Sequence, residues 1–315
     1  MLSAGEPAQL RPLSLGELFD RAVTLYVRNA ALFTLIALVV VLPLAVMNYF
    51  VSMQDSATFA QILAQVQHPG KGPPPVSGMG GGMTLMFGML AVAIVLGAFA
   101  VVAIAAAVGE LYRSGRAEFA PCYARALRRA GAILLALLCE IAVFTFVVFA
   151  GAFAMGLVFV AAFLLVRGSA ALGVAAFIGA LIIGVMWLVA MLLCYLAFAF
   201  AFNALGIEGI GAGAAIGRGF SRIFNRTELL RATLICAALI AMYAGLTAVS
   251  LGMSAVFETL HLRLLNVALS ALISLVTTSF FGILFAVYYF DVRVRREGLD
   301  MQAQIESLQP TAAAS

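Results

Sequence analysis

Long apolar runs without charge are the sequence feature that most constrains the fold of this chain. Six such runs occur, at residues 30–51, 83–109, 132–166, 168–205, 232–257 and 264–290. A helix rises about 1.5 Å per residue, so about 20 residues cross a hydrocarbon core of roughly 30 Å, and every run is long enough. An outer-membrane barrel would instead show alternating segments of about 10 residues. We therefore predict an all-α, polytopic bundle of six transmembrane helices.

The composition excludes several classes of protein. Hydrophobic residues make up 64% of the chain and charged residues only 10%, against about 25% charged residues in a soluble domain. The charges also gather between the apolar runs. These values exclude a disordered tail, an ordinary cytosolic enzyme and a nucleic-acid module, so we expect no nucleic-acid partner.

The positions of the basic residues predict the orientation in the membrane. Of the 18 lysines and arginines, all but three lie in four segments. These segments are the one before the first run, the one between the second and third runs, the one between the fourth and fifth runs, and the one after the sixth run. The exceptions are Lys71, Arg167 and Arg263. Loops rich in Lys and Arg stay in the cytoplasm, which predicts that both termini are cytoplasmic. A seventh crossing within 132–205, with Arg167 buried, would divide the basic residues equally, and we reject it.

A basic stretch precedes each odd-numbered run. The first stretch has the spacing of a capping box at Ser14 and Glu17, the second is expected to begin at Pro121, and the third repeats arginine every fourth residue from Arg218 to Arg226. We predict three hairpins, each preceded by a basic amphipathic surface helix. Their arginines form the expected face for anionic membrane lipid: Arg21, Arg28, Arg125, Arg128, Arg129, Arg218, Arg222 and Arg226. A protein partner docked on the cytoplasmic face, or the topological rule alone, would explain the same charges.

Glu140 is the one ionisable acid or base inside the six runs. A charge near mid-bilayer is costly, so we expect Glu140 to face the bundle. Counted along the helices, Tyr195, Tyr243 and Thr278 lie at similar depth on other runs. We therefore predict a buried polar layer of these four residues, either a structural contact or a proton or solute site.

Residues for catalysis or metal binding are scarce. The two histidines, His68 and His261, fall in separate loops, and the glycines at 80–82 lack the Lys-Ser/Thr of a phosphate loop. The four cysteines, Cys122, Cys139, Cys194 and Cys236, lie in the runs or a cytoplasmic loop and are not expected to form disulfides. We predict no catalytic residues, no metal site and no cofactor.

Both ends of the chain resemble a known family. The stretches from Arg11 to Ala22 and from Tyr288 to Gly298, with similarity around Glu208 and from Arg218 to Phe224, resemble the membrane domain of bacterial glycerophosphoryl diester phosphodiesterases. The resemblance implies about six helices. Members of the family mostly lack an established activity, because the family name comes from fusions to a separate catalytic domain, which we do not expect in this chain. The third and fourth runs are longer than the family's, and the Pro-Gly break expected between them is missing.

These observations predict one transmembrane domain over residues 1–298 and a flexible cytoplasmic tail over 299–315. The expected location is a bacterial cytoplasmic (inner) membrane, crossed several times. The expected function is to organise lipid or a partner complex there without catalysis. The alternatives are a small-solute transporter that uses the layer around Glu140, and an intramembrane enzyme, for which the sequence offers only one buried acid.

Overall fold

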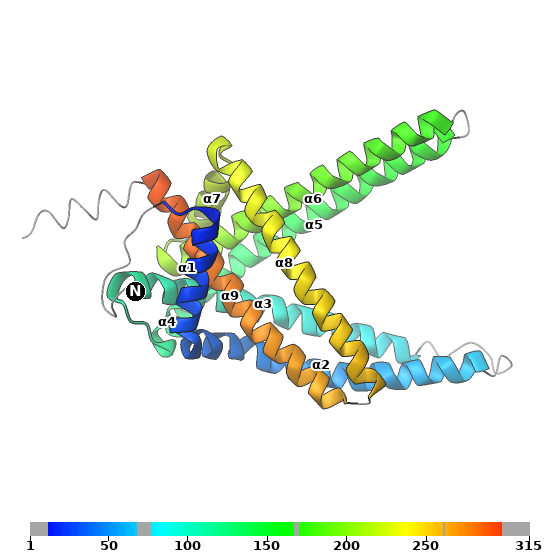
Figure 1. The fold of residues 1–315 in the computed structure, drawn as a ribbon, viewed down its shortest axis with the longest axis horizontal. Helices are drawn as coiled ribbons and strands as arrows, with labels where there is room; N and C mark the ends of the chain where they lie inside the picture. The colour runs from blue at the N-terminus through cyan, green and yellow to red at the C-terminus, as the bar shows by residue number, and fades with distance from the viewer. Residues whose placement is uncertain (1–11, 68–76, 167–169, 261, 298–315) are drawn as a thin grey trace, which may run out of the picture. The chain divides into compact units, whose positions relative to one another are not determined.

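The computed structural model describes residues 12–67, 77–166, 170–260 and 262–297 (Figure 1). These residues form helices and no strands, as the all-α prediction requires. The predicted tail, His68, His261, Lys71 and Arg167 lie outside the described residues.

Among the described residues, six helices are long and apolar enough to cross a membrane, which confirms the number of apolar helices expected from the sequence. They are α2 (Ala30–Gln67), α3 (Ser77–Ser114), α5 (Ala130–Val166), α6 (Ala170–Ile207), α8 (Arg226–Thr259) and α9 (Arg263–Glu297). Several extend past the apolar runs: α8 begins six residues before its run, because the backbone hydrogen-bond ladder continues as readily through polar residues as through apolar ones.

Three short helices, α1 (Leu15–Arg28), α4 (Phe119–Arg128) and α7 (Ala212–Ile223), precede α2, α5 and α8. The predicted capping box of α1 is confirmed, since the Ser14 hydroxyl accepts from the Glu17 N–H at 3.3 Å and the Glu17 carboxylate accepts from the Ser14 N–H at 2.8 Å. The predicted start of α4 at Pro121 is wrong by two residues. Proline is tolerated within a first turn because the N–H groups there have no helical partner.

The prediction that Arg218, Arg222 and Arg226 share one helix is also wrong. The first two lie on α7, which ends at Ile223, and Arg226 is the first residue of α8. The break is set by Asn225, whose carbonyl accepts from the N–H groups of Glu228 and Leu229 and so starts a new helix.

The chain divides into two compact units, with one boundary between α4 and α5 and the other inside α8. The first unit holds residues 1–128 and 243–315, so both ends of the chain belong to it. Within it, α9 packs against α1, α2 and α3. The helices α9 and α3 approach closely at Gly282, where a Cβ atom would lie 2.7 Å from the Cδ1 atom of Ile104. The Ser279 hydroxyl donates to the Phe33 carbonyl of α2 at 3.1 Å.

The second unit, residues 129–242, is built around the pair of α5 and α6, with α7 packed on α6. The indole N–H of Trp187 on α6 donates to the Val147 carbonyl of α5 at 2.9 Å, and the ring covers Gly151. Gly219 of α7 lies directly against the Ala197 carbonyl, where a side chain would not fit. The prediction of a single transmembrane domain over 1–298 stays a prediction.

Candidate functional site

A carboxylate lies near the C-terminal end of each of α3, α6 and α9. Each carboxylate binds either a side chain of a neighbouring short helix or the backbone just before that helix. These carboxylates are Glu110, Glu208 and Asp291. We refer to the three sets of contacts as the carboxylate clasps. Their ion pairs include three of the eight arginines that the sequence assigned to a lipid-binding face: Arg125, Arg218 and Arg222.

The clasp at Asp291 joins the two ends of the first unit. Asp291 is 2% exposed, and its carboxylate accepts the backbone N–H of Leu13 at 2.6 Å and the Arg295 Nε at 3.2 Å. Arg295 also donates to the Leu13 carbonyl at 2.6 Å. The entry to α1 is therefore fixed through its backbone, and the buried charge has an ionic partner one turn away.

Aromatic rings lie beside this clasp. The Arg21 guanidinium lies 5.4 Å from the centroid of the Tyr112 ring, which in turn lies 4.8 Å from the Phe290 ring. An arginine over an aromatic face is attracted by the ring quadrupole. Arg21 therefore has a partner inside the protein, contrary to the simplest picture of a lipid-facing side chain.

The clasp at Glu110 holds α4 through an ion pair with Arg125. The Tyr123 hydroxyl of α4 donates to the Ile36 carbonyl of α2 at 3.1 Å, which adds a second link. Burial raises the pKa of Tyr123 to about 12. Burial, helped by the charge of Glu110, raises the pKa of the Cys122 thiol to about 11 against the opposing effect of Arg125. Cys122 is therefore a protonated core residue at neutral pH.

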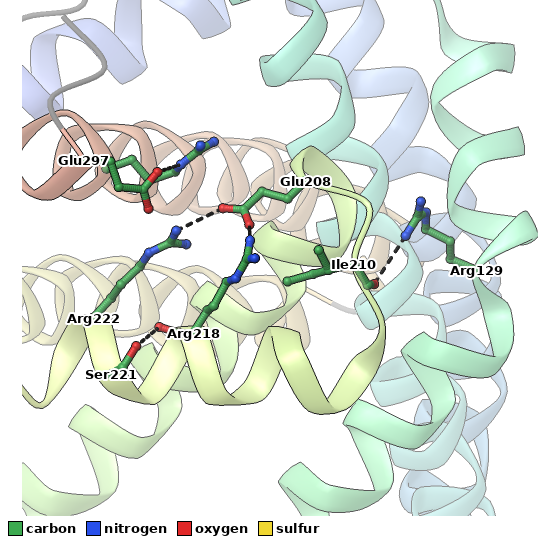
Figure 2. Close-up of polar contacts among 8 residues, drawn as sticks. Arg129, Glu208, Ile210, Arg218, Ser221, Arg222 and Glu297 are labelled. Carbon is green, nitrogen blue, oxygen red and sulfur yellow. Dashed lines mark hydrogen bonds and ion pairs between the residues drawn. The ribbon is translucent and has the colours of Figure 1, made fainter. Parts of the chain in front are cut away.

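The clasp at Glu208 involves two arginines of α7, as Figure 2 shows. Glu208 pairs with Arg218 and, at 3.1 Å, with Arg222, whose side chain is only 7% exposed. The turn between α6 and α7 needs glycine at position 209, where φ is +73° and the Arg129 guanidinium fills the space that a side chain would take. Arg129 donates to the Ile210 carbonyl at 3.3 Å, which fixes the same turn (Figure 2).

The remaining arginines of the predicted lipid-binding face differ in exposure. Arg28 and Arg128 are exposed, and Arg128 donates to the Ala124 carbonyl of its own helix. Arg226 begins α8, and its side chain lies outside the described residues. The predicted face thus contains both half-buried or buried arginines and exposed arginines.

The residues of the predicted polar layer lie on four helices. Glu140 is half-buried on α5 and Tyr195 is exposed on α6, both in the second unit. Tyr243 is exposed on α8 and Thr278 is half-buried on α9, both in the first unit. No hydrogen bond between Glu140 and Tyr195 is observed, and the layer stays a prediction.

Within the described parts of the chain, no group of three or more His, Cys, Asp or Glu side chains is arranged to hold a metal ion. The four cysteines are free thiols. The glycines at 80–82 lie within α3.

The sequence analysis did not single out the three carboxylates as a set. A signal for them was present: Glu110 and Asp291 each follow an apolar run directly, and Glu208 follows one after two residues. Each is the first acid after an even-numbered run, where a helix leaves the apolar region and enters the basic segment that follows it.

No protein-family model matches the chain, and neither a curated protein nor a solved structure is significantly similar to it. The family assignment drawn from the sequence stays a prediction.

Proposed function

We propose that this chain is a multi-pass protein of a bacterial inner membrane that binds anionic lipid at its cytoplasmic face and has no catalytic activity of its own. In this proposal the six long helices form three hairpins, both termini are cytoplasmic, and α1, α4 and α7 are amphipathic helices at the membrane surface. The resemblance to the membrane domain of glycerophosphoryl diester phosphodiesterases supports the non-enzymatic role.

One observation carries the proposal: each short helix buries small or apolar residues and exposes an arginine. Helix α1 buries Leu18 and Ala22, α4 buries Cys122 and Ala126, and α7 buries Ala215, Gly219 and Ile223. The exposed arginines are Arg28 on α1, Arg128 on α4 and Arg218, which is 49% exposed, on α7. A helix with this division lies in the plane of the interface, with its basic side towards the headgroups.

The arginines of the predicted lipid-binding face differ in exposure. Arg125 pairs with Glu110, and Arg222, which is only 7% exposed, pairs with Glu208. The side chains of Arg28 and Arg128 are exposed. A basic residue near an anionic leaflet contributes about 1 kcal/mol of attraction. We therefore assign lipid binding to Arg28 and Arg128 ahead of Arg222.

The test compares lipid retention in paired variants. The protein would be extracted in mild detergent from membranes of phosphatidylcholine with about 25% phosphatidylglycerol, which resembles an anionic leaflet. Mass spectrometry would then count the phosphatidylglycerol molecules retained per protein. Replacing Arg28 and Arg128 with Gln removes two charges, which at about 1 kcal/mol each weakens binding roughly 30-fold. Replacing both with Lys keeps the charge and should keep the lipid.

Three results would contradict the proposal. Equal phosphatidylglycerol retention in the Gln and Lys variants would indicate that these arginines only set the orientation of the chain in the membrane and do not bind lipid. A polypeptide that co-purifies with the Lys variant and is lost from the Gln variant would point to a protein partner. Solute flux in proteoliposomes that is lost in Glu140→Gln, with folding intact, would favour the transport alternative.

A further inference from the structure

One face of α8 carries a row of hydroxyl side chains. Positions 243, 247, 250 and 254 are three or four residues apart, so their side chains lie one above another along the helix. We call this row the α8 stripe: Tyr243, Thr247, Ser250 and Ser254. A row with similar spacing on α9 is the α9 stripe: Asn266, Ser270, Ser274 and Thr277. Both stripes lie in the first unit, within segments apolar enough to span a membrane, and neither stripe contains a charged residue.

The two stripes face each other at the turn between α8 and α9. The Ser254 hydroxyl donates to the side-chain carbonyl of Asn266 at 3.0 Å. The helices run antiparallel from this bond, so each turn back along α8 is matched by one turn forward along α9. Ser250 and Ser270 each lie one turn from the bond, and we therefore place them at the same level on the two helices.

The α9 stripe lies on the side of α9 that α2 and α3 leave uncovered. Ser279 donates to the Phe33 carbonyl of α2, and Gly282 lies against Ile104 of α3. Ser279 follows Thr277 by two residues, which corresponds to about 200° around a helix. Within the first unit, the α9 stripe is therefore turned away from α2 and α3 and towards α8.

The α8–α9 pair is open beyond its turn. Helix α2 packs along α3 and α5 packs along α6, whereas the part of α8 in the first unit meets α9 at the turn and does not pack along it (Figure 1). The Thr247 and Thr277 hydroxyls donate to carbonyls of their own helices at 2.8 and 2.7 Å. The hydroxyls of Ser250, Ser270 and Ser274 form no hydrogen bond within the described parts of the chain.

The chemistry of the stripes selects a class of ligand. Lipid tails offer no hydrogen-bonding group, so hydrocarbon cannot satisfy these serine hydroxyls. A hydroxyl both donates and accepts, as does the Asn266 carboxamide, and groups of this kind bind the hydroxyls of a ligand. A charged ligand would find no opposite charge in either stripe, and a charge is costly inside a membrane. The stripes therefore fit an uncharged ligand with several hydroxyl groups.

The extent of the stripes sets the direction of approach. The α8 stripe runs about 17 Å from Ser254 to Tyr243 at 1.5 Å per residue, roughly half of a hydrocarbon core of about 30 Å. Phe281 takes the next position of the α9 stripe, one turn after Thr277, so the row of polar residues ends there. A site with these bounds is reached from the turn and is not a pore.

We propose that an uncharged, hydroxyl-bearing small molecule binds between the α8 stripe and the α9 stripe and enters from the turn that joins the two helices. In the orientation proposed above, this turn lies on the outer side of the membrane. The site uses no arginine of the predicted lipid-binding face. It is therefore a second binding function, which does not depend on the binding of anionic lipid.

Labelling of single cysteines tests whether water reaches the stripes. In a variant whose four cysteines are replaced by alanine, Ser250→Cys and Ser270→Cys would be treated from outside with a charged, membrane-impermeant methanethiosulfonate. The matched controls are Val249→Cys and Leu272→Cys, which lie at similar depth on the same helices but off the stripes. Thiols react as thiolates, which form in water and not in hydrocarbon, so we expect the stripe positions to react roughly ten times faster or more than the controls.

Erythritol, a small polyol, is the probe for the ligand. It should slow the labelling of Ser250→Cys and Ser270→Cys as its concentration rises, whereas erythronate, the acid with the same carbon chain, should not. The unsubstituted protein provides a measurement without cysteine variants. Erythritol should raise its midpoint of thermal unfolding more than that of Ser250→Ala combined with Ser270→Ala, and this difference removes the general stabilising effect of a polyol.

Three results would overturn the proposal. Equal labelling of stripe and control positions would show that water does not reach the stripes. A disulfide that forms between Ser250→Cys and Ser270→Cys in one chain, without labelling of either, would show that the stripes close on each other. Labelling that erythritol does not slow, with equal unfolding midpoints, would show that water alone fills the site.

A further cysteine separates the proposal from the orientation of the chain. Arg263→Cys is exposed beside the turn and should be labelled from the same side as the stripes. If Arg263→Cys reacts only in inside-out vesicles, the proposed orientation is wrong. The comparison of stripe and control positions would then be made in those vesicles, with the same outcomes deciding the binding site.

Discussion

The backbone N–H of Leu13 donates to Oδ1 of Asp291 across 2.6 Å, although 278 positions separate the two residues in the chain. Arg295 completes the contact, because it bonds both the Asp291 carboxylate and the Leu13 carbonyl. The start of the first short helix is therefore attached to the last long helix of the same unit.

Replacing Asp291 with Ala should free this attachment. The Leu13 N–H loses a charged acceptor, and hydrogen bonds to charged groups contribute about 1.5–3 kcal/mol, so we expect a loss of that size in the free energy of unfolding in detergent. A protease should also remove an N-terminal tag faster. The control is Glu297→Ala, which removes the partner of Arg293 in the last turn of α9 and should cost less than about 0.5 kcal/mol. Equal effects of the two changes would contradict a special role for Asp291.

The two arginines that bind Glu208 should differ in importance. Arg222 is 7% exposed, and removing one partner of a buried pair costs about 3–5 kcal/mol, so Arg222→Gln should destabilise the protein strongly. Arg218 is 49% exposed, and its replacement by Gln should cost about 1 kcal/mol or less. Thermal unfolding of the purified variants measures the difference, and a larger effect at Arg218 would refute this ranking.

Replacing each of two glycines of α7 with alanine should change the free energy of unfolding in opposite directions. A methyl group at position 219 would collide with the Ala197 carbonyl, so Gly219→Ala should push α7 from α6 at a cost of about 1–3 kcal/mol. Position 217 has open space, and there alanine should stabilise the helix by up to about 1 kcal/mol. The measurement is again the unfolding free energy, and two changes of the same sign would argue against the packing described for α7.

Cys122 should react slowly with maleimide at neutral pH. Burial raises the pKa of its thiol from 9.0 to about 11, so the reactive thiolate forms only in strongly alkaline solution. The stabilising effect of the protonated thiol is complete below pH 9 and is lost as the pH rises through about 11. In a variant with no other native cysteine, labelling of Cys122 would be compared with that of Arg128→Cys, exposed on the same helix. Similar rates at pH 8 would disprove the burial of Cys122.

Reporter fusions would test the orientation. If the chain crosses the membrane six times with cytoplasmic ends, reporters placed after Lys71, Arg167 and Arg263 should all read as outside. A cytoplasmic reading after Arg167 would restore a third crossing within residues 132–205.

Features that depend on neighbouring residues were predictable from the sequence. The capping box at Ser14 needs only the residue three positions later, and the number of long apolar helices needs only the length of each run. The contacts of the arginines were not predictable in this way. Whether Arg222 faces lipid or Glu208 depends on the turn at Gly209, and whether Arg226 continues α7 depends on the break at Asn225.

The contact between Leu13 and Asp291 could not be predicted from the sequence for a different reason. Contacts across 278 positions are set by how the long helices pack, and a pattern of residues does not state which helices become neighbours. The sequence did mark Asp291, as the first acid after the last apolar run, but not the backbone group that it would bind.

The attachment of Leu13 to Asp291 also sets an order of events during synthesis. A ribosome makes the N-terminal segment first and Asp291 among the last residues, so the early segment waits for most of the chain to be translated and inserted before its acceptor exists. The second unit, residues 129–242, is complete well before that moment. A chain truncated before residue 291 would therefore carry a finished second unit, whereas the Leu13 N–H would lack its acceptor.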